Sequence, residues 1–278
     1  MDDSLCQETF SRLRRDTVWI NGASRSPLPS STLAVGLAAI RKKAETPWDI
    51  GNTDGDKQEI RRLFAELIGS SPRPDVRDIA LTPSCSYAMS LAAANLRSRM
   101  LPGRRQVLVL EDQMHSNVMP WQQLCAETGG EILRVARPAD YNWTDSVVRA
   151  VERGTVAICA LPPCHWCDGS IVDLTAVGTA CRRQGVALVI DGTQWIGGGE
   201  CLEAVRIGAC FVACSVHKWL LGPYGCCLCY ASPEFWQQVG SAFFCRSLNL
   251  CGILCGVVGL SGNVTFAESS ALVGCSEH

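Results

Sequence analysis

One lysine stands apart from the other basic residues of the chain. The sequence contains four lysines, and Lys218 is the only one between Gln58 and His278. It lies in the segment SVHKWLLGP (residues 215–223), between an apolar run and a Gly-Pro turn. A loop lysine can attack an aldehyde when burial or a nearby cation lowers its pKa from about 10.4. This position therefore indicates carbonyl chemistry; the alternative is a lysine that only extends into solvent.

Two polar residues accompany this lysine. Asp191 directly follows the apolar run VALVI (residues 186–190), Gln194 comes about one helical turn later, and Lys218 follows the next expected strand in the same way. An aspartate in this place can also be a helix N-cap. Aspartate, glutamine and lysine at successive strand ends are what a pyridoxal phosphate site needs. The lysine forms the imine, the aspartate keeps the ring nitrogen protonated, and the glutamine bonds the phenolic oxygen.

The phosphate of that cofactor needs N–H and hydroxyl donors, preferably at a helix N-terminus. The segment LTPSCSYAMSL (residues 81–91) predicts a strand, a turn and the start of a helix. Ser84 and Ser86 supply hydroxyls there, and Ser215 and His217 can close the phosphate cup from the lysine loop. Taken singly, Ser84 and Ser86 are ordinary helix caps, so the prediction rests on all these residues together.

Expected helices and strands alternate from about residue 30 onward. Ser30 opens a helix that we expect to reach Glu45, and Asp54 or Asp56 caps a second one. This second helix carries an apolar stripe of Ile60, Leu63, Phe64, Leu67 and Ile68 and ends at Gly69. Strands are expected at residues 79–81, 107–110, 132–135, 156–161, 187–190, 211–214 and 227–230. Wholly apolar strands separated by helices predict an α/β three-layer sandwich with a mainly parallel central sheet, which binds ligands at the carboxyl ends of its strands.

The composition of the chain limits which binding partners and which cell compartment we expect for the protein. A formal net charge of −2, from 25 basic and 27 acidic residues, gives no reason to expect nucleic acid or an anionic membrane as partner. The longest apolar stretch, residues 248–260, is shorter than the roughly 20 residues of a membrane span. The acidic start MDDSLCQE lacks the pattern of a secretory signal, so we expect a cytoplasmic protein whose 17 cysteines are free thiols.

Six segments carry a resemblance to a known family. They are NGASRSPL (residues 21–28), the turn at residues 82–91, EDQMHSNVMPW (111–121), HWCDG (165–169), DGTQ (191–194), and SVHK followed by GPYG (215–218 and 222–225). In order and spacing the chain resembles, over roughly residues 19–238, the class V aminotransferase-like enzymes. These belong to the fold-type I pyridoxal phosphate group and include cysteine desulfurases, kynureninases and isopenicillin N epimerase.

The resemblance implies a role for each residue of the site. Lys218 would form the Schiff base, Asp191 would pair with the pyridinium nitrogen, and Gln194 would contact the phenolic oxygen. The residues that would hold the phosphate are Ser84, Cys85, Ser86, Ser215 and His217. Met114 occupies the position where relatives stack an aromatic or histidine on the ring, with His115 beside it; the alternative is that both only pack at a strand end. Arg25 is the expected substrate-binding residue, in place of an arginine from the small domain, and a surface arginine is the alternative.

The resemblance also implies a domain organisation and a homodimer. We expect an N-terminal segment at residues 1–30, a cofactor-binding large domain at residues 31–240, and an irregular tail at residues 241–278 in place of the C-terminal small domain. Fold-type I enzymes build each site at a dimer interface, so a homodimer is expected by analogy.

Other motifs in the sequence give weaker support to metal, dinucleotide or serine-hydrolase chemistry. The segment CHWC (residues 164–167) has the spacing of a zinc or redox pair, but no second pair follows at zinc-site spacing, so no metal is expected. Three glycines at residues 197–199 do not form the GxGxxG pattern of a dinucleotide loop, and no Gly-x-Ser-x-Gly elbow of a serine hydrolase occurs.

The sequence thus predicts a pyridoxal phosphate enzyme that acts on an amino acid. Transamination, β-elimination at a C–S bond and racemisation all stay open, because substrate orientation decides which bond breaks. A cysteine desulfurase is expected less than a transaminase or lyase. In the family the nucleophilic cysteine lies on a loop far downstream of the lysine, in a region that we expect this chain to lack. The alternative of another class is a catalytically incomplete homologue that binds the cofactor weakly or serves as an interaction module.

Overall fold

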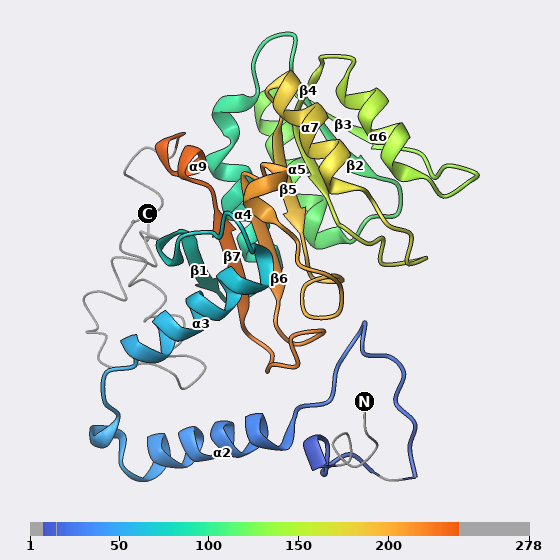
Figure 1. Ribbon diagram of the computed structural model, residues 1–278. Helices are drawn as coiled ribbons and strands as arrows, with labels where there is room; N and C mark the ends of the chain where they lie inside the picture. The colour runs from blue at the N-terminus through green and yellow to red at the C-terminus, as the bar shows by residue number, and fades with distance from the viewer. Residues whose placement is uncertain (1–7, 15, 239–278) are drawn as a thin grey trace.

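A seven-stranded sheet forms the centre of the protein (Figure 1). The computed structural model describes residues 8–14 and 16–238. The strands are β1 (Ile79–Thr82), β2 (Gln106–Leu110), β3 (Glu131–Val135), β4 (Val156–Leu161), β5 (Ala187–Asp191), β6 (Phe211–Ser215) and β7 (Cys227–Ala231). They lie in the order β1-β7-β6-β5-β4-β2-β3. Strand β7 runs antiparallel to both of its neighbours, and the remaining pairs are parallel.

The helices cover both faces of this sheet. They are α2 (Ser30–Glu45), α3 (Asp54–Ile68), α4 (Cys85–Asn95), α5 (Met119–Thr128), α6 (Trp143–Val151), α7 (Leu174–Gln184), α8 (Ala204–Ile207) and α9 (Pro233–Gln238). Short 3₁₀ turns lie at Pro47–Asp49, Val76–Asp78, Arg97–Arg99 and His115–Asn117. Helices α3, α6, α7 and α8 pack on one face, and α4, α5 and α9 on the other. The prediction of a three-layer α/β fold is confirmed.

Strand alternation explains why the apolar runs form this sheet. Val107 and Val109 point into the core under α4 and α5, whereas Leu108 and Leu110 point into the core under α6 and α7. A strand with a helix layer on each side needs apolar residues at every position, so a continuous run is its signature. Strand β3 lies at the edge of the sheet, and only its last residue, Val135, is buried.

The structure agrees with the expected ends of the helices better than with the side chains expected to be buried. Helices α2 and α3 span the predicted residues, but the N-cap of α3 is Thr53, and Asp54 is already its first helical residue. The predicted stripe of α3 is partly wrong, because Leu63 and Leu67 are 46% and 41% exposed. Packing on the sheet uses a narrower face made of Phe64, Ala65 and Ile68.

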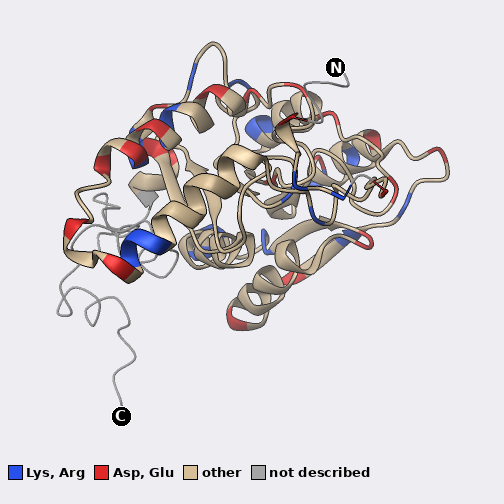
Figure 2. Cartoon of the chain, turned by 90° about the horizontal axis from the view of Figure 1, so that it is seen from below, with Lys and Arg blue, Asp and Glu red and all other residues tan. Residues whose placement is uncertain are grey.

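Helix α2 lies apart from the sheet in Figure 1, and none of its residues is buried. Viewed from below, it is mostly uncharged, with basic residues near its carboxyl end (Figure 2). Its exposed apolar side chains include Val35, Leu37 and Ile40. Among the described helices, none combines the length and hydrophobicity of a bilayer-crossing segment. The tail predicted at residues 241–278, with its long apolar stretch, lies outside the described residues.

Helices α7 and α8 approach each other closely at Gly178. A Cβ atom there would collide with the backbone carbonyl of Ile207, which cannot move like a flexible side chain. Gly178→Ala should therefore lower the free energy of unfolding by about 3 kcal/mol, the upper range of overpacking in a core. Urea unfolding followed by circular dichroism measures this.

Gly36 in α2 is the matched control, because nothing lies within 4 Å of a Cβ added there. Gly36→Ala should leave stability unchanged or raise it by about 0.5–1 kcal/mol through helix propensity. Equal effects of the two substitutions would contradict the close packing of α7 on α8.

Candidate functional site

A cavity of about 550 Å³ opens at the carboxyl edge of the sheet. Its walls come from the segments that follow β1, β2 and β4, from the ends of β5 and β6, and from the N-terminal segment. The described lining residues are Asn21, Ala23, Ser24, Ser84, Cys85, Ser86, Gln113, Met114, Ser116, Asn117, Pro162, Cys164, Trp166, Asp191, Thr193, Gln194, Ser215, His217 and Lys218. A cavity of this size suits a small organic ligand.

Asp191 is the last residue of β5, and the sheet itself aims it into the cavity. The residue is only 7% exposed, and its Oδ1 accepts a hydrogen bond from the Thr193 amide at 3.1 Å. The Thr193 hydroxyl accepts in turn from the Ser215 amide at 3.2 Å, which joins the ends of β5 and β6. Asp191 caps no helix, and among the described residues its Oδ2 accepts no hydrogen bond.

Lys218 follows β6 on a tight loop that lies against the same cavity. Hydrogen bonds from the Leu221 amide to the Lys218 carbonyl at 3.0 Å and from the Gly222 amide to the Val216 carbonyl at 2.8 Å close this loop. Leu221 adopts a left-handed backbone with φ of 54°. Within the described part of the chain, the Lys218 amine forms no hydrogen bond and no ion pair.

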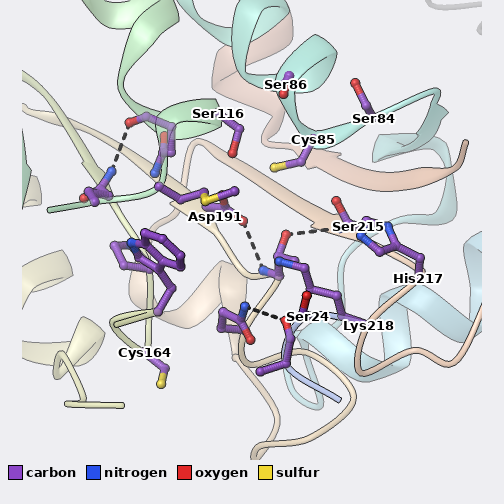
Figure 3. Close-up of a pocket in the computed structure, with 18 of the residues that line it drawn as sticks. Ser24, Ser84, Cys85, Ser86, Ser116, Cys164, Asp191, Ser215, His217 and Lys218 are labelled. Carbon is purple, nitrogen blue, oxygen red and sulfur yellow. Dashed lines mark hydrogen bonds between the residues drawn. The ribbon is translucent and has the colours of Figure 1, made fainter. Parts of the chain in front are cut away.

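The N-terminus of α4 forms the opposite wall. The Ser84 hydroxyl caps the helix by accepting from the Tyr87 amide at 3.1 Å, so the predicted capping role is confirmed. The first amides of a helix have no partner within it, and those of Cys85 and Ser86 begin α4 beside the cavity. Figure 3 shows these three residues together, with Ser215 and His217 reaching toward them from the lysine loop.

Titratable groups in this wall are held in their neutral forms. A hydrogen bond with Cys227, together with burial, keeps the pKa of the Cys85 thiol well above its usual range. Burial and the neighbouring Lys218 lower the pKa of His217. The α4 wall therefore offers hydrogen-bond donors without a thiolate that would repel an anion.

Gln194 fastens the N-terminal segment over the lysine loop. Its Oε1 accepts from Trp219 Nε1 at 2.8 Å, and its Nε2 donates to the Ala23 carbonyl at 3.0 Å. An indole nitrogen only donates and a carbonyl only accepts, so these partners fix the amide orientation. Among the described residues, the second N–H of Gln194, a residue that lines the cavity, has no hydrogen-bond partner.

The structure separates the expected site residues into two groups. Those that line the cavity are Ser84, Cys85, Ser86, Met114, Asp191, Gln194, Ser215, His217 and Lys218. His115 is exposed and starts the turn His115–Asn117, and Arg25 is exposed; neither lies among the lining residues. Of the adjacent pair, Met114 is the one that faces the cavity.

Several lining residues were missed in the sequence. Asn21 and Ser24 reach the cavity because Gln194 holds their segment there. Ser116 and Trp166 stand in two of the segments that carried the family resemblance, so their place after a strand end was a usable signal. Figure 3 shows Ser116 on the same side as the α4 residues and Ser24 near Lys218.

The CHWC segment belongs to no cluster of metal-ligating side chains among the described residues. Within residues 8–14 and 16–238, no group of three or more histidine, cysteine or acidic side chains is arranged to hold an ion. Cys164 lines the cavity and Cys167 is exposed, and both are free thiols.

His165, between these cysteines, is fully buried and stacks on Trp143 with ring centroids 5.2 Å apart. Its Nε2 lies 2.9 Å from the Glu111 carbonyl, which can only accept, so Nε2 carries the proton. Its Nδ1 then accepts from the Cys167 amide at 3.4 Å. Burial is the main cause that lowers its pKa, so His165 joins the two cavity loops as a neutral ring.

Fold and site together define an α/β protein with a lysine and an aspartate at the ligand-binding edge of its sheet. The model of the class V aminotransferase family matches residues 52–253, and the chain belongs to that family.

Curated relatives of the chain are cysteine desulfurases. A probable cysteine desulfurase of Vibrio cholerae is 28% identical over 165 residues, which cover 59% of this chain and 40% of the relative. A cysteine desulfurase of Klebsiella pneumoniae is 27% identical over 229 residues, covering 80% and 55%. The chain thus spans about half the length of the curated relatives it matches.

Solved structures share the fold. The cysteine desulfurase CsdA of Escherichia coli superposes with a TM-score of 0.73 at 19% identity, covering 86% of this chain and 60% of that one. The apo cysteine desulfurase of Thermococcus onnurineus gives a TM-score of 0.71 at 19% identity, covering 87% and 60%.

Stability should depend on the neutral state of His165. Because its folded pKa lies below the ordinary value of about 6.5, the unfolded chain binds the proton more readily as the pH falls. The free energy of unfolding should therefore decrease as the pH drops through about 6.5. His165→Gln, which keeps an N–H donor but does not titrate, should reduce this decrease; His217 contributes the rest with the same sign.

Urea unfolding at a series of pH values gives the slope. A slope in His165→Gln equal to that of the wild type would contradict the neutral, buried imidazole.

Proposed function

We propose that the cavity binds pyridoxal 5′-phosphate and that the protein acts on an amino acid. The main support for this proposal is that one cavity holds an amine without a partner among the described residues and a carboxylate with one oxygen unbonded. Asp191 supplies the carboxylate at the end of β5, and Lys218 supplies the amine on the loop that follows the neighbouring parallel strand β6. When bound, this cofactor supplies an aldehyde for amines and an electron-withdrawing ring for a substrate carbanion.

The donors and acceptors present fit that group. The open Oδ2 of Asp191 suits a protonated ring nitrogen, and the free N–H of Gln194 suits the phenolic oxygen. Met114 is 37% exposed at the cavity and would cover a ring face with its thioether. Helix α4 presents its first amides beside the hydroxyls of Ser84 and Ser86, a favourable site for a phosphate. Cys85, Ser215 and His217 would complete that phosphate cup, with Cys85 contributing its backbone amide.

Lys218 has a second role in the proposed reaction. With the cofactor and an amino acid bound, the Lys218 amine would take and return the proton at the substrate α-carbon. Asp191 would stabilise positive charge on the cofactor ring. Among the possible outcomes we favour β-elimination at a C–S bond over transamination, because curated relatives carry the name cysteine desulfurase and one structural neighbour is described as a cystine C–S lyase.

A second candidate function is cofactor binding without turnover. One observation favours it: among the described lining residues there is no arginine to hold a substrate carboxylate. Arg25 is the proposed substitute, and movement of the segment held by Gln194 would be needed to bring it to the cavity. For the domain organisation we keep the division expected from the sequence, with a cofactor-binding domain at residues 31–240 after an N-terminal segment at residues 1–30; residues 241–278 lie outside the described part of the chain.

Labelling distinguishes these functions. Purified protein mixed with pyridoxal phosphate should develop imine absorbance, and borohydride reduction should fix the label on the peptide that contains Lys218. Release of sulfide and pyruvate from cysteine, or of cysteine persulfide and pyruvate from cystine, by the unreduced sample then supports the lyase. Label without turnover supports the second candidate.

Lys57→Arg is the matched control, because Lys57 pairs with Asp54 on α3 and does not line the cavity. It should label as the wild type does, whereas Lys218→Arg should lose the absorbance. Label that persists in Lys218→Arg would contradict the proposed site.

We also propose that the protein is a cytoplasmic homodimer. No disulfide joins the cysteines of the described residues, which agrees with a reducing compartment. The apolar side chains of Val35 and Ile40 on α2 are 67% and 64% exposed, and an exposed apolar face is typical of an interface.

Light scattering should give twice the chain mass of 30.0 kDa. The double substitution Val35→Lys and Ile40→Lys should shift the mass toward one chain. A wild-type mass of one chain would contradict the dimer.

A further inference from the structure

Trp166 is the large side chain of the cavity that the proposed cofactor roles do not use. It follows β4 on the segment HWCDG, lines the cavity and is 46% exposed. Its Nε1 donates to the Asp112 carbonyl at 2.6 Å, so the ring is held in place although it is not buried. An anchored and half-exposed indole in a cavity wall is typical of a surface that a ligand covers.

The residue that accepts this bond is itself held firmly. Asp112 adopts a left-handed backbone with φ of 53°, which is unfavourable for a residue with a side chain. Arg137 pairs with the Asp112 carboxylate at 3.3 Å and with Asp168, and His165 bonds the preceding carbonyl, that of Glu111. These contacts join the loop after β2 to the loop after β4 and fix the direction of the Trp166 ring.

The charges around the cavity indicate what this wall can accept. Among its described lining residues, only Asp191, His217 and Lys218 carry acidic or basic side chains. Under the proposed function Asp191 and Lys218 serve the cofactor, and His217 belongs to the phosphate cup. No cation is therefore left to pair with an acidic substrate side chain, and its desolvation would be uncompensated.

We propose that Trp166, together with Pro162, forms the subsite for the substrate side chain and selects amino acids with neutral, apolar or sulfur-bearing side chains. This inference rests on the proposed function and adds to it the class of substrate. An indole surface attracts polarisable groups such as sulfur, whereas a carboxylate gains nothing from it.

Stable adducts measure this selection without turnover. Reduced N-phosphopyridoxyl amino acids carry the cofactor and the substrate side chain in one molecule, and their dissociation constants for cofactor-free protein can be measured by calorimetry. The adducts of methionine and glutamate have side chains of similar length and differ in charge, and the alanine adduct gives the baseline. The methionine adduct should bind about tenfold more tightly than the glutamate adduct.

Two variants test the assignment to Trp166. Trp166→Ala should weaken binding of the methionine adduct about tenfold and leave the alanine adduct within about twofold. Trp166→Phe, which keeps an aromatic face but loses the bond to Asp112, should give an intermediate loss. Trp48→Ala is the matched control, because Trp48 is 77% exposed outside the cavity, and it should bind every adduct as the wild type does.

The outcomes separate this inference from the proposed function. If no adduct binds the wild type, both are overturned. If all adducts bind the wild type equally, or if Trp166→Ala keeps the wild-type preference for methionine over glutamate, the side-chain subsite is overturned while cofactor binding stands.

Discussion

The parallel pairing of β5 with β6 is the constraint on which the site depends. This pairing sets Asp191 opposite Ala213, so both strands end at the same edge of the sheet. Neighbouring strands lie about 4.8 Å apart, which brings a carboxylate at the end of one strand close to a loop that follows the other. Thr193 then locks the two ends together through one bond to Asp191 and one to Ser215. A slip of one residue in either strand would turn its side chain away from the cavity.

The second property of the cavity is that few charged side chains line it. The thiol of Cys85 and the imidazoles of His165 and His217 lie close to the lysine or to the loops around it, and the pKa of each is shifted toward the neutral form. Lys218 and Asp191 are then the charged side chains that a ligand meets among the described lining residues. Under the proposed function, the α4 N-terminus adds the partial positive charge that a phosphate needs.

Much of the fold was predictable, because the buried strands are apolar along most of their length. Strands β4 and β5 follow the expected ranges closely for this reason. The antiparallel direction of β7 was not predictable, since its run CLCYA resembles the parallel strands in composition. The exposed Leu63 and Leu67 show the limit of helical periodicity, which identifies a stripe but not how much of it the sheet covers.

The candidate site was predictable where residues follow strand ends and less so where distant segments meet. Asp191 and Lys218 belong to the first kind. Ser24 belongs to the second, because its segment is brought to the cavity by bonds from Gln194 to the Ala23 carbonyl and from the Ser26 amide to the His217 carbonyl. Met114 and His115 are adjacent, and no sequence pattern could tell which one faces the cavity; the turn that starts at His115 decides it.

The central claim is that one carboxylate holds a protonated heterocycle beside one amine, and nuclear magnetic resonance of ring-¹⁵N-labelled pyridoxal phosphate tests it most directly. The account predicts a protonated ring nitrogen in the wild-type protein at neutral pH, and loss of that proton in Asp191→Ala with Asp49→Ala as the surface control. A nitrogen that is unprotonated in the wild type, or that keeps its proton in Asp191→Ala, would contradict the account.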